Sequence, residues 1–141
     1  MPSYPEFHVI GVTGMPEVKK GDGLADLILK ASEAQGTPIE DNDIVVVTQK
    51  IVSKTEGALV DLKTVEPSEM AKTMAADWDK DPRHVEVVLQ ESRRIVRMDH
   101  GVLITETKHG FICANSGVDA SNVPGEDMLC LLPKDPDASA E

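Results

Sequence analysis

The sequence predicts an α+β fold, with a mixed but largely antiparallel sheet and flanking helices, in one domain over residues 1–141. Strand and helix patterns are intermixed, without the strict alternation that a doubly wound parallel sheet requires. Hairpin signals also come late in the chain, where Asp99–Gly101 separates the strand-like runs Arg93–Met98 and Val102–Thr107. These two observations favour α+β over a Rossmann-type layout.

In the first part of the chain, one apolar run is followed by turn residues and then by a helical pattern. Phe7–Val12 predicts a strand, and Gly14 and Pro16 then break regular structure. We expect a helix from Asp22, a plausible N-cap, to the stop signal at Gly36. Its apolar residues recur at helical spacing: Leu24, Leu27, Ile28 and Ala31.

A second apolar run follows. Ile44–Val47 is a continuous β-branched stretch, typical of a strand that is buried on both faces. Residues 48–55 fit either a helix or a strand, and Gly57 indicates a short helical turn that ends there. Ala58–Leu62 predicts the next strand.

Two helices with clear start signals come next. The first runs from about Pro67 to Trp78. The second starts where Asp81 can cap and Pro82 takes the first helical position, and it ends near Ser92. After the hairpin we expect strands at Phe111–Cys113 and Met128–Leu132, then a helix start capped by Asp137 or Ser139.

The composition is that of a folded chain with an aliphatic core, since 40% of residues are apolar and only 3% are aromatic. A net charge of −11 disfavours binding to nucleic acid or to anionic membranes. The N-terminus lacks a signal-peptide pattern, and no run reaches the about 20 apolar residues of a membrane span, so we expect a cytoplasmic protein. Cys113 and Cys130 are expected to be buried, reduced thiols.

A polar stretch, residues 113–123, is the first candidate site. Gly117 allows a close backbone approach, and Asp119 offers the carboxylate oxygen that Mg²⁺ or Mn²⁺ prefers. Neutral hydrogen-bonding groups surround it at Asn115, Ser121 and Asn122. The alternative is a loop whose side chains only cap their own backbone turns.

Two basic areas stand out in this acidic chain. Lys50 and Lys54 follow the apolar run Ile44–Val47, and the end of a strand is a common place for ligands. Their ammonium groups suit phosphate oxygens, although they could equally be solvated surface residues. The second area could hold an anionic substrate or merely balance carboxylates; it comprises Arg93, Arg94, Arg97, Lys108 and His109.

Four motifs along the chain, taken together in their order, indicate a family resemblance that includes both candidate sites. They are Gly14–Val18, Ile44–Gly57, Asn115–Val123 and Leu131–Ser139. In sequence and order they resemble the coenzyme F420-0:L-glutamate ligases. The resemblance extends over nearly the whole chain and covers the N-terminal part of the family's ligase domain.

The resemblance implies a GTP-dependent reaction that also needs Mg²⁺ or Mn²⁺. The lactyl carboxylate of the deazaflavin F420-0 would be activated, and the amine of L-glutamate would then attack to give an amide, GDP and phosphate. No catalytic base is implied. Met15, Pro16, Glu17 and Val18 would line the nucleotide site, Lys54 would meet the phosphates, Asn122 would contact the nucleotide and Asp119 would hold the metal. Gln49 would also contact the nucleotide, although some family members have a small hydroxyl residue there.

The family has a further Asp-Thr pair of metal ligands beyond the last residue of this sequence. The resemblance therefore implies an incomplete portion of a larger ligase fold, which would work as a homodimer or with a complementing C-terminal half. The alternatives are a catalytically silent module that binds nucleotide or deazaflavin, and a fragment that binds no ligand.

Overall fold

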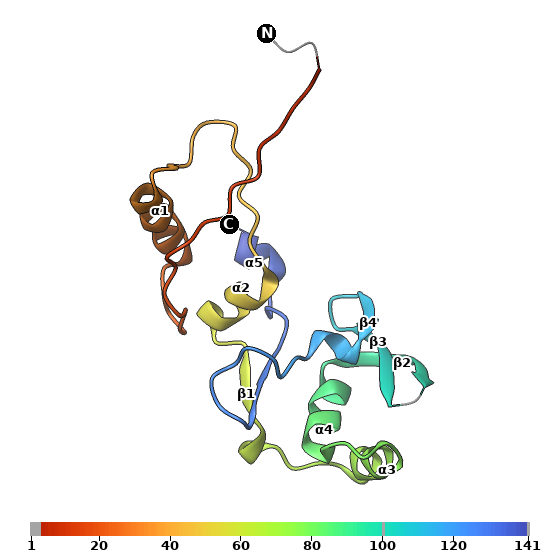
Figure 1. The fold of residues 1–141 in the computed structure, drawn as a ribbon. Coiled ribbons are helices and arrows are strands. Elements are labelled where there is room, and N and C mark those ends of the chain that lie inside the picture. Colours follow the sequence, from red (N-terminus) through yellow and green to blue (C-terminus); the bar gives the residue numbers. More distant parts are fainter. Residues whose placement is uncertain (1–3, 100, 141) are drawn as a thin grey trace.

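A computed structural model describes residues 4–99 and 101–140 (Figure 1). The predicted α+β class is confirmed, because helices and antiparallel strands are mixed along these residues. The helices are α1 (Leu24–Gln35), α2 (Gln49–Glu56), α3 (Glu69–Trp78), α4 (Pro82–Gln90) and α5 (Pro136–Ala140). The strands are β1 (Leu59–Asp61), β2 (Ser92–Asp99), β3 (Val102–Thr107), β4 (Ile112–Ala114) and β5 (Met128–Cys130).

The described strands form two sheets, and every pairing in them is antiparallel. One sheet has the order β2-β3-β4, with Ile95 opposite Thr105 and Thr105 opposite Cys113. The other pairs β1 with β5, with Val60 opposite Leu129. The late hairpin is therefore confirmed, and its turn includes residue 100, which lies outside the described residues.

The two middle helices begin where the sequence predicts. The Ser68 hydroxyl accepts a hydrogen bond from the Ala71 amide at the start of α3, at 3.2 Å. The Asp81 carboxylate accepts from the Arg83 amide at 2.8 Å, and Pro82 occupies the first turn of α4. Both capping side chains satisfy amides that have no partner within the helix.

Two expected caps are wrong. Gly23, not Asp22, is the N-cap of α1, because the Asp22 carboxylate instead accepts from the Lys19 amide at 2.8 Å. At α5, the Asp135 carboxylate accepts from the Ala138 amide at 3.2 Å, so neither Asp137 nor Ser139 is the cap. In both cases a neighbouring residue is better placed for the first turn.

The hydrophobic core lies between the α3–α4 pair and the strands that they cover. It is aliphatic, as the composition predicts, and Leu129 of β5 and Leu103 of β3 are almost fully buried in it. Its other buried members are Leu62, Ala71, Met74, Ala75, Val85, Val87, Val88 and Val118. Because α3 and α4 pack directly against each other, the central part of the chain has a contiguous core.

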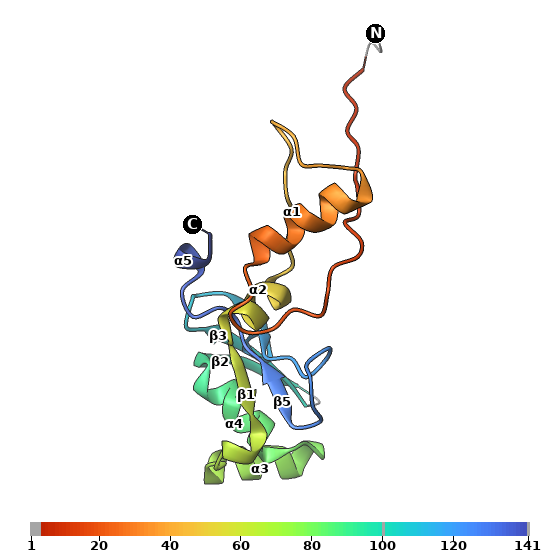
Figure 2. The same cartoon turned by 90° about the vertical axis from the view of Figure 1, so that its left-hand side faces the viewer.

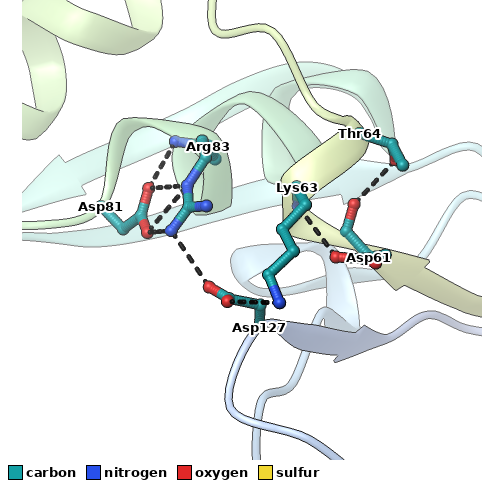
Figure 3. A network of polar contacts seen from close by, with 6 residues as sticks. All are labelled: Asp61, Lys63, Thr64, Asp81, Arg83 and Asp127. Carbon is teal, nitrogen blue, oxygen red and sulfur yellow. Dashed lines mark hydrogen bonds and ion pairs between the residues drawn. The ribbon is translucent and has the colours of Figure 1, made fainter.

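A polar network ties the start of α4 to the ends of β1 and β5 (Figure 3). The Arg83 guanidinium donates to Asp81 at 2.6 Å and to Asp127 at 3.2 Å. Lys63 lies 3.5 Å from Asp127, and its amide donates to the Asp61 carboxylate at 2.9 Å. The Arg83 side-chain hydrogen bond is the main reason that the pKa of Asp81 lies below its ordinary value.

Two predicted strands do not form. Phe7–Val12 and Ile44–Val47 have no strand partner among the described residues, and both are exposed. Figures 1 and 2 show the N-terminal segment, α1 and the chain leading to α2 standing apart from the two sheets. A β-branched run indicates burial, but a strand also needs a partner for its backbone groups.

Among the described residues, no helix combines the length and the apolar character needed to cross a membrane.

Candidate functional site

The candidate site is organised by α2, which lies between α1 and the β1–β5 sheet (Figures 1 and 2). Lys50 and Lys54 are four residues apart, so they project from the same face of this helix. The Lys54 ammonium donates to the Glu17 carboxylate at 2.6 Å. The Lys50 ammonium contacts the Asp119 carboxylate. One helix face thus holds carboxylates from two distant loops.

Asp119 is the most strongly bonded of these acids. Its backbone forms a two-way bridge with Cys130, with N–O distances of 3.0 and 2.8 Å. Its carboxylate accepts from the Ser121 amide and hydroxyl, both at 2.8 Å, and from Lys50. The Lys50 hydrogen bond, followed by the Ser121 amide, lowers the pKa of Asp119 to about 2. Charge on this carboxylate is therefore favoured at neutral pH.

Lys50 also donates to the carbonyl and the hydroxyl of Ser121, at 3.0 and 2.8 Å. The sequence indicated Lys50, like Lys54, as an ammonium suited to phosphate oxygens, and did not predict its contact with Asp119. The polar loop also caps itself at this point, since Asp119 binds the amide two residues further on. The self-capping interpretation of the loop therefore holds at this point, and the metal-binding role of Asp119 stays a prediction.

The loop containing Met15–Val18 is attached to both α1 and α2. The Thr13 amide and hydroxyl donate to the Gln35 side chain, each at 2.7 Å, and the Gly21 amide donates to the Thr55 carbonyl at 2.8 Å. Within this loop, Val18 is buried, Met15 is half-buried, and Pro16 and Glu17 are exposed. Of these four residues, which the sequence predicts to line the nucleotide site, only Glu17 contacts Lys54.

Gln49 and Asn122, the other two residues predicted to contact the nucleotide, differ in their hydrogen bonding. The Gln49 amide donates to the Ser53 hydroxyl and to the Leu131 carbonyl, the latter at 3.1 Å, so it links α2 to the end of β5. Asn122 has a positive φ of 56° and is exposed, and within the described chain its side chain makes no hydrogen bond. Gln49 is thus held by protein groups, whereas Asn122 is accessible.

Lys54 and Asp119 are connected through α2, because Lys50, which contacts Asp119, lies one helical turn before Lys54. Burial is the main cause that raises the pKa of the Cys130 thiol, and a hydrogen bond with Ser53 opposes it. The Lys54 side chain is only 12% exposed, whereas the Glu17 side chain that covers it is 69% exposed. Both cysteines are free thiols; Cys130 is buried as expected, but Cys113 is only half-buried.

The described residues do not by themselves form a metal centre. They contain no group of three or more His, Cys, Asp or Glu side chains that could hold an ion. Asp119 supplies one carboxylate, which already binds an ammonium, whereas Mg²⁺ requires near-octahedral oxygen coordination. Any metal at Asp119 would therefore need ligands from other groups.

An apolar cavity of about 260 Å³ lies beside the first turn of α2. It is lined by Gln49 and Val52 of α2 and by Phe111, Leu132 and Pro136, among others. His109 also lines it, with its ring 6.3 Å from that of Phe111. The cavity is lined almost entirely by apolar groups, so it offers space for a hydrophobic ring rather than for phosphate.

The second basic area balances carboxylates. Arg93 and Arg94 both pair with Glu106, the latter at 2.6 Å. Arg97 pairs with Asp99 at 2.7 Å and Lys108 with Glu91 at 3.0 Å. The His109 ring faces the Lys134 carbonyl at 3.4 Å. The three arginines lie on β2, Lys108 and His109 follow β3, and each of these side chains has a local partner.

Comparison of the sequence with known proteins places this chain in a family. A sequence profile described as F420-0:Gamma-glutamyl ligase matches residues 13–141. A protein of Methanothermobacter thermautotrophicus named coenzyme F420:L-glutamate ligase is 46% identical over 133 residues, which are 94% of this chain and 52% of the relative. Relatives with the same name in Methanopyrus kandleri and Haloarcula marismortui are 46% and 40% identical, covering 88% and 94% of this chain.

The aligned part is 47% of the Methanopyrus protein and 51% of the Haloarcula protein. The chain thus spans about half the length of the curated relatives it matches. Since the profile match includes the Glu17 loop, α2 and the Asp119 loop, this chain belongs to the F420-0:γ-glutamyl ligase family.

Proposed function

We propose that this chain is the N-terminal portion of a cytoplasmic, GTP-dependent and Mg²⁺- or Mn²⁺-dependent ligase. It would form an amide between L-glutamate and the lactyl carboxylate of coenzyme F420-0. The observation that carries this proposal is the pair of lysines on one face of α2, each held by a carboxylate from a distant loop. Two ammonium groups at one helix face suit an anionic, phosphate-bearing substrate.

Lys54 is the group that we expect to meet the nucleotide phosphates. Its ammonium is nearly buried, so a phosphate oxygen in place of Glu17 would gain a charge-assisted hydrogen bond in a partly desolvated site. The exposed Glu17 carboxylate can swing into solvent at little cost. Lys50 would meanwhile keep the Asp119 loop against α2.

The proposed reaction has two steps. A carboxylate oxygen of F420-0 attacks the γ-phosphorus of GTP, the bond to the bridging oxygen breaks, and GDP leaves. The glutamate nitrogen then attacks the acyl carbon, the bond to phosphate breaks, and one amine proton is released. A lysine ammonium next to the transferring group would offset the negative charge that develops there.

The metal in this proposal would need ligands that the described residues do not provide, apart from Asp119. The working form would therefore be a homodimer or a complex with a complementing C-terminal half. Neither nucleic acid nor a membrane is a partner in this proposal, because the chain carries a net charge of −11.

The test is to incubate the chain, together with a complementing C-terminal half taken from a relative, with F420-0, GTP, L-glutamate and Mn²⁺ and to search by mass spectrometry for glutamate addition to F420-0. We expect the product to depend on GTP and on glutamate. Lys54→Ala should reduce the yield about tenfold or more, whereas Lys72→Ala, on the exposed face of α3, should not change it. Equal yields from both variants would contradict the role of Lys54.

One observation favours a second candidate, a catalytically silent module that binds nucleotide or deazaflavin. The described residues keep the Lys54 site and the apolar cavity but no metal centre. Such a module would bind GDP in calorimetry with saturable heat and yet give no glutamate adduct. A degenerate fragment would give neither signal.

A further inference from the structure

Residues 7–12 and 44–47 are two apolar segments that have no partner among the residues that the structure describes. Phe7 and Val9 are 87% and 85% exposed, and Ile44 and Val46 are both 88% exposed. In an extended chain, residues two apart point to the same side, so each pair forms one apolar stripe. Exposed apolar stripes on an otherwise acidic chain mark a surface that another polypeptide covers.

The backbone of these segments is equally unpaired. Within the described part of the chain, neither residues 7–12 nor residues 44–47 make a backbone hydrogen bond. Both segments are rich in β-branched or aromatic residues, which favour strands. Free backbone donors and acceptors beside apolar side chains are what a second chain uses when it adds a strand.

We propose that Phe7–Val12 and Ile44–Val47 are docking strands, and that their partner is a polypeptide equivalent to the half of the relatives that this chain does not span. The relatives are about twice as long as the region they share with this chain, so their other half is the natural source of the missing strands. A second copy of this chain fits less well, because it would bring another eleven net negative charges to the contact.

Docking at these segments would act directly on the candidate site. Residues 7–12 lead into the loop that carries Glu17, and residues 44–47 lead into α2 with Lys50 and Lys54. Strand pairing would therefore fix the positions of the Glu17 loop and of the start of α2. This inference depends on the family membership, and it specifies the partner that the proposed function requires.

The test uses this chain together with the C-terminal half of the Methanothermobacter thermautotrophicus relative, produced as a separate polypeptide. We expect a one-to-one complex in which amide hydrogen exchange in residues 7–12 and 44–47 slows at least tenfold. Val9→Lys and Val46→Lys should each weaken the complex at least tenfold, because a strand contact would bury the new charge. Neither change should alter the melting temperature of the chain alone, since both side chains are already exposed.

Met70→Lys is the matched control, because Met70 is also an exposed apolar residue but lies on α3. It should leave the affinity unchanged. A complex without slower exchange in the two segments, or with equal affinity for Val46→Lys, would overturn the proposal. Slower exchange that appears in the chain alone as its concentration rises would overturn it in favour of a second copy.

If the separate half does not fold, the same substitutions are made in a single-chain fusion of the two halves. Val46→Lys should then lower the melting temperature of the fusion, and no change would overturn the proposal. Activity distinguishes this inference from the proposed function. A complex with protected segments but no glutamate addition would refute the ligase function alone, whereas turnover by the chain without a partner would refute the docking inference alone.

Discussion

At Asp119, a single carboxylate accepts hydrogen bonds from an ammonium and from a neighbouring loop amide. The Lys50 contact is the largest cause of the lowered pKa, so removing it should move the pKa of Asp119 back toward its ordinary value. We expect Lys50→Met to raise this pKa measurably, as followed by NMR titration of the carboxyl carbon. Lys63→Met, which removes an exposed lysine from the Asp127 pair, should leave it unchanged.

The same shift gives a pH dependence of stability. The folded-state pKa of Asp119 is about 2, below its ordinary value of 3.8, so its contribution is present above pH 4 and is lost as the pH falls toward 2. The difference in urea midpoint between the wild type and Asp119→Asn should therefore shrink over this range. Because the side chain is 44% exposed, we expect a small difference even at pH 7. A difference that grows on acidification would contradict this assignment.

Asp119→Asn also tests the binding role of this carboxylate. If Asp119 contributes to metal-dependent nucleotide binding, the variant should bind GDP more weakly in the presence of Mn²⁺ and equally well without it. Titration calorimetry under both conditions measures this difference. Equal affinity of the variant and the wild type in Mn²⁺ would remove Asp119 from the site.

At the scale of elements, the Asp81 cap supports both α4 and the network to Asp127. We expect Asp81→Ala to lower the free energy of unfolding by about 1 kcal/mol, the usual cost of losing an N-cap. In a domain of this size that corresponds to a melting temperature lower by about 4 °C, measurable by circular dichroism. Asp77→Ala, near the exposed end of α3, is the control and should cause no loss. Equal stability of both variants would mean that the cap contributes nothing.

The elements that the sequence predicted correctly are those with local signals. Ser68 and Asp81 sit directly before α3 and α4, and Gly57 ends α2 in the left-handed conformation with a φ of 73°. The β2–β3 hairpin likewise depends on residues close in sequence. Such signals act within a few positions, so pattern reasoning can find them.

Apart from the two caps, where a neighbouring residue takes the place of the expected one, the errors concern features that depend on distant groups. Ile44–Val47 has the composition of a buried strand, yet composition cannot supply the neighbouring strand that would bury it. The contact of Lys50 with Asp119 joins residues 69 positions apart, and no periodicity marks it. For the candidate site, the sequence alone indicated Lys50, Lys54 and the polar loop, and only the fold brings them to one helix face.

At the scale of the whole molecule, a compact part and an open part meet at α2. The aliphatic core of α3, α4 and the strands supports one side of the site, whereas residues 4–48 stand apart from the sheets (Figure 1). Met15–Val18, which are predicted to bind the nucleotide, belong to the open part before α2. Asp119, which pairs with Cys130 of β5, belongs to the compact part. The site therefore depends on how these two parts are held together.

The central claim is that the nearly buried Lys54 ammonium receives the phosphates of a guanine nucleotide. The most direct measurement is a calorimetric titration of the wild type and of Lys54→Ala with GDP and with guanosine, in the presence of Mn²⁺. We predict saturable GDP binding that weakens about tenfold or more in Lys54→Ala, with guanosine binding unchanged, because only GDP has phosphates for this charge-assisted contact. Equal losses for GDP and guanosine, or no saturable GDP binding by the wild type, would contradict the claim.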